Sequence, residues 1–151
     1  MKRLTLILSV LLVSFCAFAE DDLTGMALSM RTQISSVLRG DGYSPSVDSD
    51  GDIAFRYEGS SYYISCENYN DEVYVRVFRD ITTSDYSDTV VRRAADIAQN
   101  EWKFVRSRVL DGFIRVECDV AVVDITEFQR RFSAFLSIIQ GTVSSINENL
   151  Y

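Results

Sequence analysis

The sequence contains no histidine, and beyond its first 19 residues it contains a single lysine, Lys103. Histidine is the commonest general base near neutral pH and a frequent metal ligand, so its absence removes much of the usual acid–base and zinc chemistry. The sequence also lacks a glycine-rich phosphate loop and a serine in a Gly-x-Ser-x-Gly elbow. We therefore expect a protein that is not an enzyme and that uses neither a cofactor nor a metal.

Cysteine is scarce as well, because Cys16 lies in the first 19 residues and only Cys66 and Cys118 follow. Both fall on apolar phases of strand-like runs, where a zinc site would be short of ligands and a nucleophile would lack a base. In an oxidising compartment they would form a disulfide if their Cα atoms came within about 7 Å. The sequence leaves two alternatives open, which are core thiols and a Cys66–Cys118 bridge.

Positive charge is also in short supply, with 15 Lys and Arg against 22 Asp and Glu and a formal net charge of −7. Two of the basic residues, Lys2 and Arg3, lie at the extreme N-terminus, so the rest of the chain is more acidic still. Nucleic acids and anionic membrane surfaces repel a chain of this charge. We expect no nucleic-acid partner.

The first 19 residues have the three-part pattern of a secretory signal peptide. Lys2 and Arg3 precede an apolar run, and Ala17 and Ala19 supply the small residues at positions −3 and −1 of a cleavage site. The run is shorter than the roughly 20 residues of a spanning helix. A lipoprotein at Cys16 would need a small residue where Phe15 stands. We predict a signal peptide at 1–19 and an exported protein, periplasmic or secreted, with no stable membrane insertion after cleavage.

Apolar spacing predicts three helices in one domain, residues 20–151. The first runs from Leu23 to a stop at Gly40, with its cap near Asp22 or Thr24. The second covers 85–100 and follows the capping candidates at 82–84. The third begins at Thr126, because Thr126-x-x-Gln129 matches a capping box and an apolar stripe follows.

Five runs read as strands, at 53–57, 61–66, 72–79, 102–109 and 113–123. Short, turn-rich links between them indicate antiparallel pairing. The predicted fold class is α+β, in the order α-β-β-β-α-β-β-α, with a five-stranded antiparallel sheet and three helices packed on one face. In the last strand Arg115, Glu117 and Asp119 share the phase opposite to the apolar residues, so we expect them to meet water or a partner.

The segment SVDSDGD sets Asp48, Asp50 and Asp52 around a glycine, like the centre of a calcium loop. Ser46 and Tyr57 stand where the two outer acidic ligands of such a loop belong, and a strand follows in place of a helix. Asp and Gly also favour turns for backbone reasons. We interpret the segment as a turn. The alternative function is a small-ligand or calcium-binding hydrolase-like protein that uses these three aspartates.

Aromatic residues crowd the first three strands, and strand parity places some of them outside the core. Tyr74, Arg76 and Phe78 share one phase of their strand, and Tyr63 is opposite in phase to its neighbours. Tyrosine, phenylalanine and arginine are enriched in interfaces, although such pairs are also ordinary on a wet sheet face. We predict that Tyr63, Tyr74, Arg76 and Phe78 bind a partner, or that the partner adds at a sheet edge through backbone bonds.

Four segments together resemble YbjN-like domains, within the type III secretion chaperone-like fold. They are LRGDGYSPSVDSDGDIAFRYEGSSYYIS, YVRVFRDI, ADIAQNEWKFVRSRVLDGFIRVECDVAV and TEFQRRFSAFLSII. The resemblance covers nearly all of 20–151 and implies a curved antiparallel sheet backed by helices, frequent dimers and no catalytic centre. Secretion chaperones of that fold hold clients in the cytoplasm, whereas the leader predicts export, and YbjN-like proteins are described mainly as regulators. We expect an exported, non-enzymatic domain that binds a protein or peptide, with a homodimer as one candidate assembly.

Overall fold

The computed structural model describes residues 25–151, so the predicted signal peptide, its cleavage residues Ala17 and Ala19, and the cap expected near Asp22 or Thr24 lie outside the described residues. The described chain is α+β, with three helices and one antiparallel sheet. The sheet has six strands, and the prediction of five was wrong. The additional strand, β1 (Ser46–Val47), is too short to show the alternation by which strands are recognised in a sequence.

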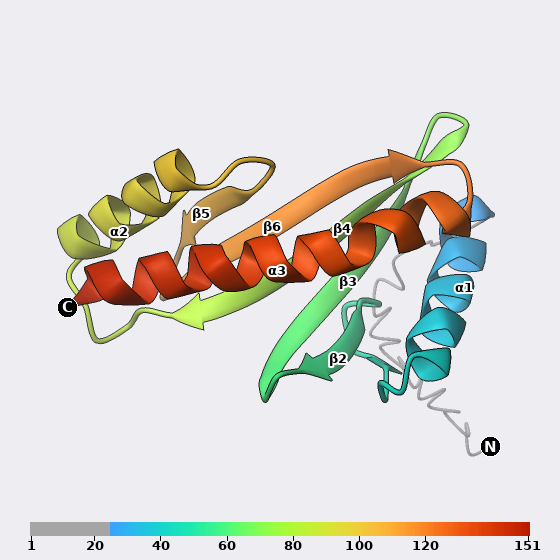
Figure 1. Ribbon diagram of the computed structural model, residues 1–151, viewed down its shortest axis with the longest axis horizontal. Coiled ribbons are helices and arrows are strands. Elements are labelled where there is room, and N and C mark those ends of the chain that lie inside the picture. Colours follow the sequence, from blue (N-terminus) through green and yellow to red (C-terminus); the bar gives the residue numbers. More distant parts are fainter. Residues whose placement is uncertain (1–24) are drawn as a thin grey trace, which may run out of the picture.

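The remaining strands, β2 to β6, follow the predicted runs, with shifted ends (Figure 1). They are β2 (Ile53–Tyr57), β3 (Ser60–Tyr69), β4 (Glu72–Thr82), β5 (Arg106–Leu110) and β6 (Phe113–Val122). Their order across the sheet is β1-β2-β3-β4-β6-β5, and every neighbouring pair is antiparallel. Strand β6 therefore lies between β4 and β5, which places the β5–β6 hairpin at one edge of the sheet.

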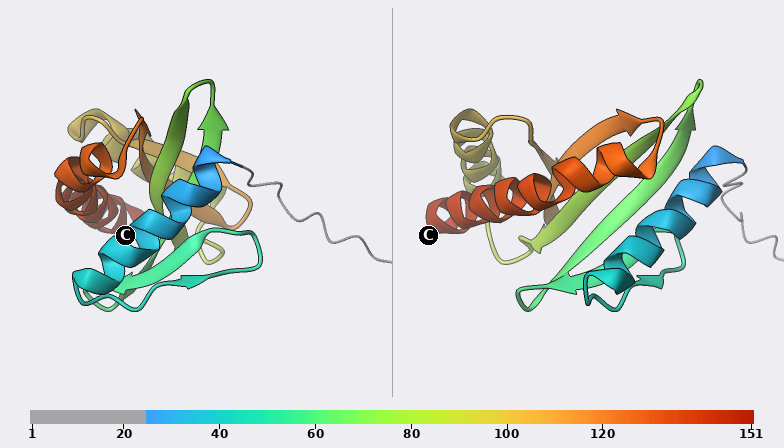
Figure 2. Two further views of the ribbon diagram at one scale, coloured as in Figure 1. Left: turned by 90° about the vertical axis from the view of Figure 1, so that its right-hand side faces the viewer. Right: turned by 45° about the vertical axis from the view of Figure 1, so that its right-hand side comes forward.

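Two helices cover one face of the sheet and the third lies at its end, so the prediction that all three helices pack on one face was wrong (Figures 1 and 2). Helix α1 (Met26–Gly40) packs on β3 and β4, and α3 (Ile125–Leu150) packs on β4 and β6. Helix α2 (Asp88–Glu101) packs against α3 and β5. The core between these helices and the sheet is formed by alternate residues of the strands, among them Phe55, Tyr62, Ile64, Val75, Val77, Ile114 and Val116.

The N-cap of helix α3 lies two residues before the predicted capping box. Its N-cap is Asp124, whose Oδ1 accepts hydrogen bonds from the backbone N–H groups of Thr126 at 2.8 Å and Glu127 at 3.1 Å. Glu127 in turn accepts from the N–H of Val123 at 3.1 Å. Asp124-x-x-Glu127 has the same spacing as the predicted Thr126-x-x-Gln129, and aspartate is an equally good cap, so spacing alone did not distinguish them.

Helix α2, in contrast, begins later than predicted, because its N-cap is Ser87 and not a residue of 82–84. The N–H of Thr83 instead donates to the carbonyl of Gly112 at 2.8 Å, in the turn between β5 and β6. Thr83 is buried and thus joins the end of β4 to that turn. Thr82 is the last residue of β4 and Thr83 bonds to the β5–β6 turn, so neither caps the helix.

Strand β5 begins at Arg106 and not at Trp102, which corrects the predicted strand 102–109. The indole of Trp102 lies against α3 at Gly141, where an added Cβ would be 2.2 Å from two of its ring atoms. This contact draws the chain before Arg106 toward the helices. Phe104, in the connecting segment, has a φ of +62° and its side chain is 85% exposed.

Candidate binding groove at the edge of strand β6

The four partner-binding residues predicted from the sequence all lie on the face of the sheet opposite α1 and α3, which we call the outer face. The strand register pairs Tyr63 with Phe78 and places Tyr74 and Arg76 on the same side of β4. Phe78 is only 2% exposed, because Tyr63 stacks on it with ring centroids 5.4 Å apart and the guanidinium of Arg115 lies 4.0 Å from its centroid. The ring of Phe78 is thus covered by side chains of the same protein and is not open to a partner.

A buried carboxylate organises the middle of the outer face. Glu117 of β6 is 1% exposed, and its oxygens lie 3.5 Å from Arg76, 3.3 Å from Arg106 and 3.7 Å from Arg108. The sequence predicted that this phase of β6 would meet water or a partner, and for Glu117 that was wrong. Long arginine side chains from the two flanking strands, β4 and β5, fold over the carboxylate and exclude water from it.

The three aspartates of the SVDSDGD segment form the hairpin turn between β1 and β2. The Oδ1 of Asp48 accepts hydrogen bonds from the backbone N–H groups of Asp50 at 3.0 Å and Asp52 at 2.9 Å, and Gly51 has a φ of +85°. One carboxylate oxygen is thus used to close the turn, as in an Asx-turn. Within 25–151, no group of three or more acidic or thiol side chains is placed to hold a metal ion.

Cys66 and Cys118 are both free and buried, which resolves the two alternatives left by the sequence. Strand β4 lies between them, because Cys66 pairs with Val75 on one side of it and Cys118 pairs with Val77 on the other. Two strand spacings amount to about 9.6 Å, which exceeds the reach of a disulfide. Burial raises the pKa of each thiol to about 12, so neither is a ready nucleophile.

The two edge strands of the sheet are short or covered, whereas part of β6 has an open edge. Strand β1 is only two residues long, and β5 is covered by α2, whose Gln99 donates to the carbonyl of Val105 and accepts from the N–H of Ser107, both at 2.8 Å. Strand β5 pairs with β6 only as far as Glu117. From Cys118 to Val122, β6 has a strand neighbour on the β4 side alone.

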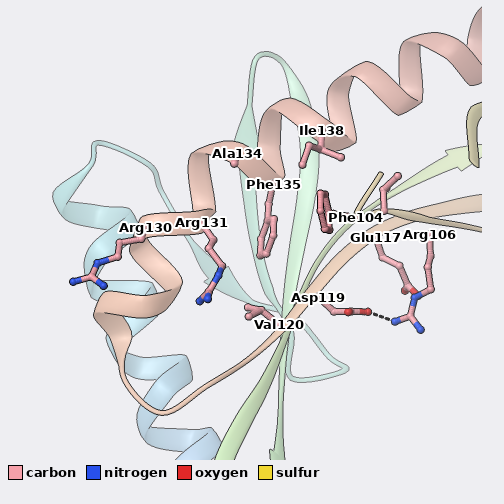
Figure 3. Close-up of a pocket in the computed structure, with 11 residues that line it drawn as sticks. Phe104, Arg106, Glu117, Asp119, Val120, Arg130, Arg131, Ala134, Phe135 and Ile138 are labelled. Atoms are coloured by element: carbon pink, nitrogen blue, oxygen red, sulfur yellow. Dashed lines mark hydrogen bonds and ion pairs between the residues drawn. The ribbon is translucent and has the colours of Figure 1, made fainter. Parts of the chain in front are cut away.

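A groove of about 580 Å³ lies beside this open stretch of β6 (Figure 3). The first turns of α3 form one wall, the sheet edge forms the other, and the segment before β5 closes one end. The lining residues are Phe104, Val105, Arg106, Glu117, Asp119, Val120, Arg130, Arg131, Ala134, Phe135 and Ile138. Figure 3 shows Phe135, Ile138 and Phe104 gathered in the middle, with Arg130 and Arg131 on one side and Arg106 on the other.

Three arginines and two acids line the groove, in a chain whose formal net charge is −7. Asp119 and Glu117 are both ion-paired with Arg106. Arg131 donates to the backbone carbonyl of Glu127 at 3.3 Å, and neither it nor Arg130 forms an ion pair with any residue of 25–151. Two arginines at the start of α3 therefore keep uncompensated positive charge at the mouth of an apolar groove.

Of the residues of this groove, sequence reasoning singled out only Glu117 and Asp119, as residues expected to meet water or a partner. Phe104 stands within the run 102–109 that reads as a continuous strand, and Arg130 and Arg131 lie outside the apolar stripe of the predicted third helix. The groove lies where β5 is shorter than its partner β6, and the chain just before β5 packs on α3 through Trp102 at Gly141. The one available signal was the position of Gly141 inside a helix, where a close approach is a common reason for glycine.

Comparison of the chain with protein-family models, with curated proteins and with solved structures finds no match. Within 25–151, no helix combines the length and the apolar character that crossing a bilayer requires. The groove and the outer face therefore have to be interpreted from their own geometry.

Proposed function

We propose that this chain is an exported, non-enzymatic domain that binds an extended segment of another protein in the groove beside β6. The observation that carries the proposal is the open stretch from Cys118 to Val122, which adjoins an apolar groove. In the bound state the segment would add as a strand to β6, in line with β5. Backbone hydrogen bonds would supply affinity, and the side chains that enter the groove would supply selectivity.

The other edges of the sheet are short or covered, which supports strand addition at β6. Unpaired strand edges promote aggregation, and proteins shorten or cover them. Here β1 is short and Gln99 covers the edge of β5, whereas the stretch after Glu117 is left open beside exposed apolar surface. The left-handed backbone at Phe104 adds support, because residues held in such conformations concentrate at functional sites.

The chemistry of the side chains supports binding over catalysis. The chain has no histidine, and burial raises the pKa of both cysteines of the described domain to about 12. Both acids in the groove are ion-paired, Asp119 with Arg106 and Glu117 with three arginines, so they do not form an isolated pair for acid–base work. The resemblance to YbjN-like domains points in the same direction.

The proposal is tested by blocking the groove without touching β6. Ala134 is exposed, lines the groove and lies on α3, so Ala134→Trp fills the space while leaving the sheet intact. Ser133→Trp is the matched control, because Ser133 is also exposed on α3 but does not line the groove. Dodecapeptides selected from a random phage-displayed library on the wild-type protein should bind Ser133→Trp normally and Ala134→Trp at least tenfold more weakly.

Two results would overturn the proposal. The first is a library that yields no binder, or only binders that Ala134→Trp retains at full affinity. The second is a wild-type dimer by light scattering that becomes a monomer in Ala134→Trp, because the groove would then hold a second copy of the chain and not a segment of another protein.

A further inference from the structure

We infer that the groove selects segments in which an acidic residue is followed, two positions later, by a large apolar residue. This inference rests on the proposed function and adds the chemical class of the partner. Two features of the described residues carry it: the uncompensated charge of Arg130 and Arg131, and the apolar cluster of Phe104, Phe135 and Ile138 farther along the same groove.

The spacing of these features along α3 matches the repeat of a strand. Phe135 follows Arg131 by four positions, and at 1.5 Å per residue the two lie about 6 Å apart along the helix axis. Side chains on the same face of an added strand recur every two residues, or about 6.6 Å. A segment paired with β6 would therefore present one helix-facing side chain to the arginines and the next to Phe135.

The direction of the segment follows from the direction of the chain. Helix α3 starts just after β6 ends, so Arg130 and Arg131 lie nearest the Val122 end of the open edge, and Ile138 lies nearer to Phe104. A segment antiparallel to β6 runs from that end toward β5, as every strand pair in this sheet is antiparallel. It meets the arginines first and the apolar cluster second, which gives the order acidic-x-apolar.

The peptide residue between the acidic and the apolar position points to the outer face of the sheet. Strand alternation there puts it in phase with Glu117 and Asp119, which are already paired with Arg106. That environment is polar and its charges are internally balanced, so a neutral polar residue suits it and no strong selection is expected. Selectivity resides in the two helix-facing positions.

The test uses synthetic peptides labelled with fluorescein. The parent is Ser-Thr-Glu-Thr-Phe-Thr-Ser, and its variants replace Glu by Gln, replace Phe by Ser, or reverse the order to Phe-Thr-Glu. Each is titrated by anisotropy against the wild-type protein and against the double variant Arg130→Gln, Arg131→Gln. The control is Arg92→Gln, Arg93→Gln, since these two arginines are exposed on α2 and do not line the groove.

We expect each of the three changes to the peptide to weaken binding about tenfold, the loss typical of one charge-assisted bond or one buried aromatic group. The Arg130→Gln, Arg131→Gln protein should bind the parent peptide about tenfold more weakly and should bind the Gln peptide no worse than wild type does. That non-additivity identifies the arginines as the partners of the acid. The Arg92→Gln, Arg93→Gln protein should match wild type.

Equal affinity for all four peptides would overturn the inference. So would library-selected binders that Ala134→Trp blocks but that lack the acidic-x-apolar pattern and ignore the arginine substitutions. In that second case peptide capture in the groove would stand and only its selectivity would be wrong. A protein that binds neither the parent peptide nor any library peptide would instead remove the proposed function itself.

Discussion

At the scale of the residue, burial sets the chemistry of the two cysteines. Cys66 and Cys118 face the helices from strands on either side of β4, and burial raises the pKa of each thiol to about 12. Their thiolate fraction near neutral pH is therefore very small, and reagents do not reach them in the folded protein. They act as small apolar core residues.

We predict that neither cysteine reacts with iodoacetamide at pH 8 unless urea is added. The measurement is mass spectrometry of proteolytic fragments containing Cys66 and Cys118, after labelling with and without denaturant. Rapid labelling of either residue in the folded protein, or a fragment in which the two are disulfide-bonded, would contradict the strand order on which this expectation depends.

Asp52 is a residue whose charge opposes folding. Partial burial, with a smaller contribution from Asp48, raises the pKa of its carboxyl from 3.8 to about 6. A raised folded-state pKa means that the group favours the native state below its ordinary pKa, and that this contribution is lost as the pH rises through about 6. At neutral pH the ionised Asp52 is therefore destabilising.

The substitution Asp52→Asn should raise the free energy of unfolding at pH 7 by about 1 kcal/mol, after allowance for partial exposure of the group. The gain should shrink toward zero at pH 4, where the wild-type carboxyl is largely protonated when folded. Urea titrations at the two pH values measure it. Asp50→Asn, at an exposed position of the same turn, should show no such gain, and equal effects of both substitutions would refute the assignment.

At the scale of the element, the contact between Trp102 and Gly141 determines where β5 begins. It holds the segment before Arg106 against α3, and so leaves the last five residues of β6 without a neighbour on that side. The same contact joins α2 to the C-terminal half of α3, together with a hydrogen bond from Ser145 to Glu101 at 2.5 Å. The groove is thus a consequence of helix packing.

Gly141→Ala should destabilise the protein, because its Cβ would lie 2.2 Å from the Trp102 ring. We expect a loss of about 2 kcal/mol, since overpacking usually outweighs the better helix propensity of alanine. Thermal unfolding measures it. Gly40→Ala is the matched control, because it also lies in a helix but has open space around it, and it should be neutral or stabilising. A stable Gly141→Ala protein would contradict the close packing.

On the outer face, Glu117 is the anion shared by the arginines of β4 and β5, the two strands that pair with β6. Glu117→Gln would leave Arg76, Arg106 and Arg108 without the carboxylate that they surround. Removing one member of a buried ionic cluster costs about 3 kcal/mol, and partial exposure of the arginines reduces this to about 2 kcal/mol. Urea unfolding should show that loss.

The control for that substitution is Glu67→Gln. Glu67 pairs with Arg76 at 3.5 Å but its side chain is 59% exposed, so its loss should change stability by about 0.5 kcal/mol or less. If the two substitutions had equal effects, Glu117 would not be the organising charge of the outer face.

The elements of the fold could be predicted from periodicity, but their ends and their charges could not. Apolar spacing located the three helices and strands β2 to β6, because those patterns are local. Strand β1, the start of β5 and the burial of Glu117 depend on contacts between distant segments, such as Trp102 with Gly141. The predicted site residue Phe78 was correctly placed in phase, yet pairing with Tyr63 and Arg115 occupies it.

At the scale of the whole molecule, the sheet has one face packed by helices and one face closed by its own side chains. Ion pairs and stacked rings across β3, β4, β5 and β6 satisfy the outer face. What remains open is a strip at the edge of β6, between the end of β5 and the start of α3. Binding activity, in this account, belongs to that edge and not to the aromatic face that the sequence suggested.

Hydrogen–deuterium exchange at residues 118–122 of the protein, with and without the labelled Ser-Thr-Glu-Thr-Phe-Thr-Ser peptide, tests this account most directly. Strand addition should slow exchange of the β6 amides that point away from β4 in that stretch, while amides of 113–117, already between two strands, should change little. A peptide that binds but leaves 118–122 unprotected, or that protects the outer face instead, would contradict the assignment of the binding site to the β6 edge.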